Sequence, residues 1–114
     1  MAKNREEWLK ERLGGIGASE AAAIVGMSPY MTNVELWELK TGRKTAVDIS
    51  DKPCVDYGKK AEEHLRELFK LDYPQYTVDY DEFGLVANCK ECPFIFATLD
   101  GELTENKCKG VLEI

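Results

Sequence analysis

The sequence contains no apolar run close to the roughly 20 residues that a helix needs to cross a bilayer. Its opening, Met1-Ala-Lys-Asn-Arg-Glu-Glu, also lacks the apolar region of a secretory signal peptide. These absences predict a cytoplasmic protein. With 114 residues, 44% of them hydrophobic, residues 1–114 are predicted to form a single domain, large enough to bury a core but small for a complete enzyme.

The sequence also lacks an excess of basic residues, since 15 Lys and Arg stand against 21 Asp and Glu and give a net charge of −6. This balance argues against indiscriminate binding to nucleic acid, which depends on cations that neutralise phosphates. It does not exclude an enzyme that acts on DNA, because some of the acids could be metal ligands whose charge an ion cancels. The net charge is therefore weak evidence in either direction.

Metal-binding soft side chains are few: Cys54, Cys89, Cys92, Cys108 and a single His64. Cys89 and Cys92 form one C-x-x-C pair, but no second close pair completes a zinc site. A redox pair would open a helix, whereas Pro93 and an apolar run follow here. Structural free thiols are favoured over zinc and redox roles. His64 lies two positions after Glu62, on nearly the opposite side of a helix, and is interpreted as a surface or core histidine rather than an acid or base.

Two apolar runs near the end of the sequence each carry one acid. Residues 94–100 end in Asp100, and residues 110–114 contain Glu113. Gly101 and residues 104–107 are predicted to form the turn between two antiparallel strands. The strands would bring both carboxylates together as an oxygen-rich site for Mg²⁺ or Mn²⁺. A turn aspartate and a solvated edge glutamate would explain the same pattern without a metal.

Helical spacing and stop residues predict four helices before the strands. The first covers residues 4–13 and ends at Gly14-Gly15; the second is capped by Ser19 and ends at Gly26. Free N–H groups at the start of the second could bind a phosphate, although the spacing alone favours an ordinary packing unit with a serine cap. A third helix, capped by Thr32, runs to residue 41, and a fourth covers residues 55–71 with Val55, Ala61, Leu65, Leu68 and Phe69 facing inward.

Residues 76–80 and 83–87 alternate as strands around a turn at residues 81–82. With the two acid-bearing runs they predict an α+β fold, in which N-terminal helices precede a mostly antiparallel meander.

Several motifs together resemble the YqaJ-type viral recombinases, a branch of the PD-(D/E)xK nucleases that includes the lambda-type exonuclease. They are Asp100-Gly101 followed after about a dozen residues by Glu113 between apolar residues, Arg12 seven residues before Ser19 in Ile-Gly-x-Ser-Glu-Ala-Ala, Ser28-Pro29-Tyr30, Leu36-Trp37, Thr41-Gly42-Arg43, and Gly58-x-x-x-Glu62. The resemblance implies a restriction-endonuclease-like core. The family motif continues with a lysine two positions after the second acid, beyond Ile114, so the chain is predicted to be a C-terminally truncated and inactive piece of a longer enzyme.

The resemblance also implies the roles of individual residues. Glu62, Asp100 and Glu113 would be the catalytic acids. Together with the backbone carbonyl of Ile114, they would hold one or two Mg²⁺ or Mn²⁺ ions. Arg12 and Ser19 would bind a DNA phosphate.

The implied activity is hydrolysis of double-stranded DNA from its ends during phage or prophage recombination, in the cytoplasm of a bacterial or phage-infected cell. The implied partners are DNA ends, a single-strand annealing protein and further copies of the chain. An unpaired sheet edge also predicts self-association by strand pairing. A non-catalytic DNA-end-binding or protein-interaction module of the same fold remains the alternative, together with a zinc module using Cys89 and Cys92.

Overall fold

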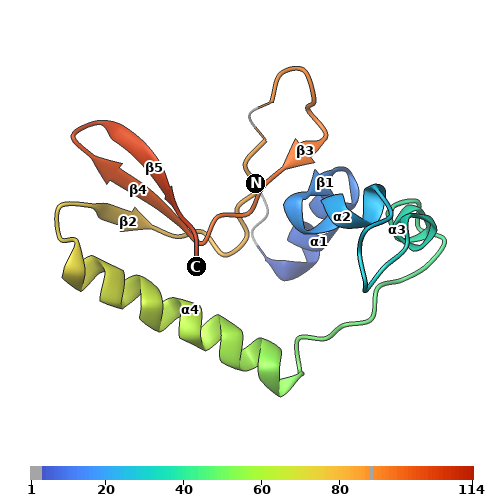
Figure 1. The fold of residues 1–114 in the computed structure, drawn as a ribbon, viewed down its shortest axis with the longest axis horizontal. Coiled ribbons are helices and arrows are strands. Elements are labelled where there is room, and N and C mark those ends of the chain that lie inside the picture. The colour runs from blue at the N-terminus through green and yellow to red at the C-terminus, as the bar shows by residue number, and fades with distance from the viewer. Residues whose placement is uncertain (1–3, 88) are drawn as a thin grey trace. The chain divides into compact units, whose positions relative to one another are not determined.

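A computed structural model describes residues 4–87 and 89–114 as a mixture of helices and strands (Figure 1). The predicted α+β class is confirmed, because a three-stranded sheet in this structure is antiparallel and is accompanied by separate helices. The described residues divide into two compact units, each built from two segments. The first unit contains the described residues up to Ala46 and Phe83–Thr98, and the second contains Val47–Glu82 and Leu99–Ile114. The prediction of one domain stays a prediction.

The first unit opens with the predicted helix, α1, over Arg5–Leu13. It begins after Asn4, whose side-chain oxygen accepts a hydrogen bond from the backbone N–H of Glu7 at 3.0 Å. This contact satisfies one of the free amides of the first turn. The helix ends at Gly14, as the sequence predicts.

Residues 16–26 form shorter elements than predicted. Strand β1 (Ile16–Gly17) is followed by a 3-10 turn, η1 (Ala18–Glu20), and by helix α2 (Ala21–Ile24). The prediction that Ser19 is an N-cap is wrong, because the turn begins before it and Ser19 lies inside the turn. The predicted stop at Gly26 is confirmed, and its φ of +72° is a conformation that glycine adopts without strain.

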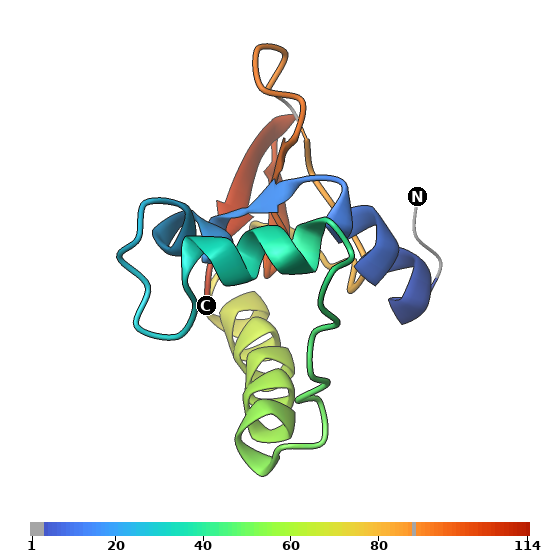
Figure 2. The same ribbon diagram turned by 90° about the vertical axis from the view of Figure 1, so that its right-hand side faces the viewer.

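Helix α3 (Asn33–Lys40) follows the predicted cap, since the Thr32 hydroxyl accepts a hydrogen bond from the Glu35 amide at 3.1 Å. Strand β3 (Ile95–Phe96) pairs with β1 in parallel, so residues far apart in the sequence complete this unit (Figure 2). The prediction of a strand over residues 83–87 is wrong. Only a single bridge forms there, between Val86 and Ala97.

Phe96 is the centre of the first unit, with 7% of its surface exposed. Ala23 and Leu36 are also buried. The Phe96 ring packs directly on the backbone of the β1 segment, where a Cβ atom on Gly15 would lie 2.8 Å from the ring and one on Gly17 would lie 3.0 Å from it. Glycine at these two positions therefore allows the aromatic ring and the strand to approach each other.

The second unit combines helix α4 (Pro53–Asp72) with strands β2 (Thr77–Asp79), β4 (Gly101–Glu105) and β5 (Cys108–Leu112). The strands form an antiparallel sheet in the order β2-β4-β5. The predicted hairpin of residues 76–80 with 83–87 is therefore wrong, because the partner of β2 is β4.

The predicted strand over residues 94–100 is also corrected. Residues 95 and 96 belong to β3 of the first unit, and β4 begins only at Gly101, which had been predicted as a turn residue. The turn between β4 and β5 contains just Asn106 and Lys107, whose φ values of 48° and 66° are typical of a two-residue type I′ hairpin loop.

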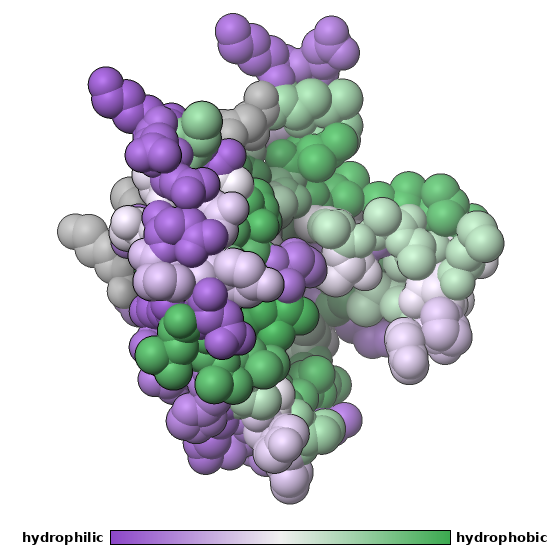
Figure 3. Space-filling model, turned by 60° about the vertical axis from the view of Figure 1, so that its left-hand side comes forward, coloured by the Kyte–Doolittle hydropathy of each residue, from purple (hydrophilic) through white to green (hydrophobic). Residues whose placement is uncertain are grey.

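The apolar side of α4 is only partly covered, in contrast to the prediction. Leu65 and Leu68 are 46% and 54% exposed, and Figure 3 shows hydrophobic residues open on the surface. A 20-residue helix is about 30 Å long, whereas strands of three to five residues are about 10–17 Å long and cannot cover it.

Among the described residues, no helix combines the length and the apolar composition of a membrane span.

Candidate active site

The acid-bearing ends of β4 and β5 meet. Gly101 of β4 stands opposite Leu112 of β5, so the next positions outward are Asp100 and Glu113. The backbone N–H of Ile114 donates a hydrogen bond of 2.8 Å to Oδ2 of Asp100, which links the two chain segments beyond the last strand pair. The hairpin thus places both predicted acids at one end of the sheet, as the antiparallel arrangement requires.

Arg66 connects helix α4 to this end of the sheet. Its Nη1 donates to the backbone carbonyl oxygen of Asp100 at 3.3 Å, and its guanidinium lies 3.7 Å from the centre of the Tyr80 ring. Only 8% of Arg66 is exposed. Glu62 precedes Arg66 by one helical turn and therefore lies on the same face of α4. This helical face, the Asp100 backbone and Tyr80 form one assembly within the second unit.

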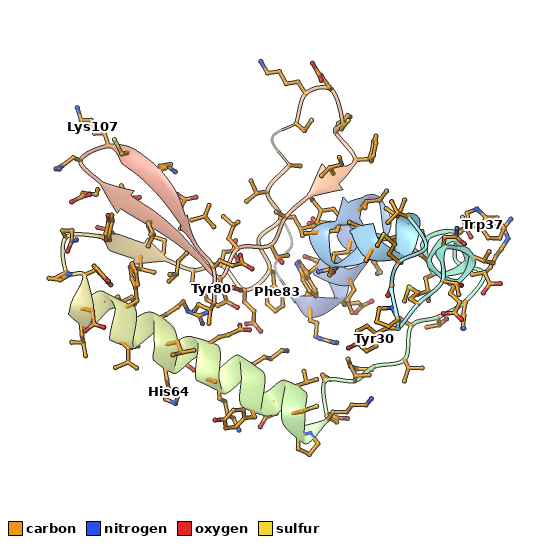
Figure 4. All side chains as sticks on the ribbon, viewed as in Figure 1. Tyr30, Trp37, His64, Tyr80, Phe83 and Lys107 are labelled. Atoms are coloured by element: carbon orange, nitrogen blue, oxygen red, sulfur yellow. The ribbon has the colours of Figure 1, made fainter. Side chains whose placement is uncertain are left out.

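The pKa of Tyr80 is affected by charged residues both on α4 and near the start of β4. Burial raises the pKa of the Tyr80 hydroxyl, the positive charge of Arg66 acts in the opposite direction, and the negative charges of Glu82, Glu62 and Asp100 raise it further. The negative charges of Glu62, on α4, and of Asp100, just before β4, thus both raise the pKa of Tyr80. Figure 4 shows Tyr80 on the side of α4 that faces the strands and His64 on the opposite side. His64 is exposed, so it lies on the surface of α4.

The three predicted metal ligands have suitable chemistry but are not gathered into a closed cluster. Glu62, Asp100 and Glu113 offer carboxylate oxygens, the donors that Mg²⁺ and Mn²⁺ prefer. In the described part of the chain, however, no three His, Cys, Asp or Glu side chains are close enough together to hold a metal ion. Glu113 is exposed and Glu62 is half-buried. The same finding gives no support to the zinc module, since Cys89 and Cys92 meet only in a local turn, where Cys89 Sγ accepts from the Cys92 amide at 3.2 Å.

The predicted phosphate ligands belong to the first unit. The guanidinium of Arg12 lies 4.7 Å from the centre of the Trp8 ring and 5.4 Å from that of Phe96. These rings hold its alkyl stem and charge without using its N–H donors. Ser19 is exposed in the 3-10 turn, where its hydroxyl can reach a ligand.

Comparison with known proteins identifies the family. Residues 7–114 match the model of the YqaJ-like viral recombinase domain. The chain belongs to the YqaJ-like viral recombinase family. It is also similar to the uncharacterized protein YqaJ of Bacillus subtilis (strain 168), with 37% identity over a 75-residue alignment that covers 62% of this chain and 23% of that protein. The matched part thus spans less than a quarter of the relative. No solved structure matches the chain significantly.

Two residues of this YqaJ-like chain join the candidate site of the second unit without having been singled out from the sequence: Arg66 and Tyr80. Arg66 could have been found from its spacing, because a charged residue one turn after Glu62 interrupts the apolar face of α4 between Leu65 and Phe69. Tyr80 is brought into the site by its contact with Arg66 of α4, which local sequence patterns do not reveal.

Proposed function

We propose that this chain supplies the acids and a phosphate-binding segment of a divalent-metal-dependent deoxyribonuclease with a PD-(D/E)xK core, which hydrolyses double-stranded DNA from its ends. The observation that carries the proposal is the β4–β5 register, which brings Asp100 and Glu113 to one end of the sheet in a chain of the YqaJ-like recombinase family. The Ile114–Asp100 hydrogen bond of 2.8 Å supports this convergence. DNA ends, a single-strand annealing protein and further copies of the chain are the proposed partners, in the cytoplasm.

Glu62, Asp100, Glu113 and the carbonyl of Ile114 are the groups that would hold Mg²⁺ or Mn²⁺. When bound, one or two such ions supply Lewis acidity to the phosphodiester and lower the pKa of an attacking water. The chain's own residues position these ligands. The Ile114 amide orients the Asp100 carboxylate, and Arg66 fixes the Asp100 backbone against α4.

Arg12 and Ser19 have a separate role in this proposal, which is to bind a phosphate of the DNA. A guanidinium is well suited to it because it donates two parallel hydrogen bonds to phosphate oxygens. In the described residues, Arg12 has stacking contacts but no carboxylate partner. Its donors are therefore available for a ligand.

Calorimetric titration with Mn²⁺ tests the metal site. Asp100→Asn should abolish binding that the unaltered chain shows, while Glu102→Gln is the matched control. Glu102 lies on β4 and pairs with Lys109 at 2.6 Å, so its loss removes the same charge near the hairpin without touching the proposed ligands. Equal Mn²⁺ affinity in all three proteins would contradict the metal site.

Digestion of linear duplex DNA tests the reaction itself. A version of the chain that continues past Ile114 with the motif lysine should degrade linear DNA in Mg²⁺, stop when a chelator is added, and lose activity with Asp100→Asn. A non-catalytic DNA-end-binding module is the second candidate, favoured by the absence of a closed three-ligand cluster among the described residues. Metal-independent binding to DNA ends without digestion would support that candidate instead.

A further inference from the structure

Lys40, the last residue of α3, is connected to two separate parts of the first unit. Its Nζ donates a hydrogen bond of 2.7 Å to the backbone carbonyl of Arg12 and forms an ion pair of 3.0 Å with Oε1 of Glu20. It also lies 5.7 Å from the centre of the Phe96 ring. A single ammonium group thus joins the end of α1 to the turn that contains Ser19.

Glu20 completes the connection from the other side. Its second oxygen, Oε2, accepts a hydrogen bond of 2.9 Å from the backbone N–H of Gly17, while Oε1 binds Lys40. The side chains of Lys40 and Glu20 are only 17% and 19% exposed. An ion pair this sheltered is held more firmly than an exposed pair, for which solvent and salt weaken the attraction.

The Glu20–Lys40 pair fixes the backbone at the end of α1, which carries Arg12, and at the start of the turn η1, which carries Ser19. The Arg12 carbonyl is fixed by Lys40 and the Gly17 amide by Glu20, whereas the Arg12 guanidinium is left to the Trp8 and Phe96 rings. Lys40 is itself occupied by an acid and a carbonyl, so its charge is already matched within the protein. Its position therefore suits a support better than a direct ligand of DNA.

We propose that the Glu20–Lys40 pair positions Arg12 and Ser19 for one DNA phosphate. This inference rests on the proposed function, because it assumes that Arg12 and Ser19 bind DNA. It adds Glu20 and Lys40 to that site as positioning residues. It also implies that Glu20, although negatively charged, favours the binding of DNA.

The sign of one substitution separates this role from simple electrostatics. Glu20→Gln removes a negative charge close to the bound DNA, so electrostatic attraction alone predicts tighter binding. Loss of positioning predicts weaker binding, by about tenfold if roughly one charged hydrogen bond to the phosphate is lost. Glu20→Asp gives a second test at unchanged net charge, since its shorter side chain cannot reach both Lys40 and Gly17.

The experiment measures fluorescence anisotropy of a short duplex with a 5′-phosphate, and of the same duplex with a 5′-hydroxyl. Weaker binding of the phosphorylated duplex by Glu20→Gln, Glu20→Asp and Lys40→Met, with near-normal binding by Lys40→Arg, supports the proposal. The double variant of Glu20→Gln with Lys40→Met should bind no more weakly than either single variant, because each single change already breaks the same ion pair. Glu6→Gln is the control, an acid whose side chain is 81% exposed in an α1 surface pair with Lys10.

Three outcomes overturn the proposal: tighter binding by Glu20→Gln, unchanged binding by Glu20→Asp, or a fall of about one in the salt-dependence slope for Lys40→Met, which would mark Lys40 as a direct phosphate ligand. Arg12→Gln tells a failure of this inference from a failure of the proposed function. If Arg12→Gln weakens binding and the Glu20 variants do not, only the positioning role is lost. If Arg12→Gln binds DNA normally, the phosphate site itself is wrong.

Discussion

Replacing the buried Arg66 by methionine should destabilise the second unit, by an amount that follows from its contacts. The hydrogen bond to the Asp100 carbonyl is long at 3.3 Å, so it contributes near the lower end of about 1.5–3 kcal/mol for a charged donor. Stacking on Tyr80 adds about 1 kcal/mol. Burial of the guanidinium, with 8% exposed, opposes both terms, because removing a desolvated charge is favourable. Methionine fills a similar volume, and the expected net loss is about 1–2 kcal/mol.

Urea unfolding of the 114-residue chain measures this loss, with Lys70→Met as the matched control. Lys70 follows Arg66 by one turn of α4, and its pair with Glu67 at 2.8 Å is partly exposed, so its removal should cost about 0.5 kcal/mol or less. A tyrosinate absorbance titration supplies an independent readout. Arg66→Met should raise the pKa of Tyr80, because the Arg66 charge lowers it while burial and the nearby acids raise it. Tyr80→Phe identifies which tyrosine responds.

The reasoning is refuted if Arg66→Met is as stable as the unaltered chain or more so. That result would mean that the cost of burying the guanidinium exceeds the sum of its two contacts, as occurs for some buried charges. Arg66 would then be retained for a reason other than stability. An unchanged pKa of Tyr80 would separately show that the guanidinium does not sit on the ring.

Three further substitutions test local features by urea unfolding. Gly15→Ala should destabilise the first unit by at least about 2 kcal/mol, because the new Cβ would lie 2.5 Å from the Phe94 carbonyl oxygen; a loss under 0.5 kcal/mol would contradict this packing. Lys107→Gly should stabilise the β4–β5 hairpin by about 0.5–1 kcal/mol, because Lys107 has a φ of 66° and the change creates an Asn-Gly turn with Asn106; a destabilised protein would argue against the type I′ loop. Thr32→Ala should cost about 1 kcal/mol by removing the α3 cap, whereas Thr32→Ser should be nearly neutral.

Several helix boundaries, although not the Ser19 cap, could be predicted from the sequence because the groups that fix them are local. Thr32 reaches an amide three residues away, and Gly14, Gly26 and Gly42 stop helices where they occur. Strand partners could not be predicted in this way. Phe96 looked like part of a strand leading into Asp100, but its neighbour is Gly17 from the beginning of the chain. No property of the 94–100 segment alone distinguishes these two arrangements.

The placement of two of the predicted site residues could be anticipated to a similar extent, whereas their roles stay predictions. Motif spacing pointed to Asp100 and Glu113, and the register between β4 and β5 brings them to one end of the sheet. Arg66 would pass for an ordinary surface charge on a helix rich in charged residues. Its burial follows from contacts with Tyr80 and the Asp100 backbone, which only the folded unit brings together.

Because each unit is built from two segments of the chain, proteolytic cleavage between the first two segments affects the two units differently. The second unit takes all of its residues from Val47 onward, whereas the first needs the segment Phe83–Thr98 to supply Phe96. Residues 45–49 are exposed and lie outside any helix or strand, so a protease can reach them. A nick before Val47 leaves the second unit covalently whole but makes the first a noncovalent complex of two peptides. The N-terminal peptide, once separated, has lost the aromatic ring on which its glycines pack, and cannot keep its fold alone.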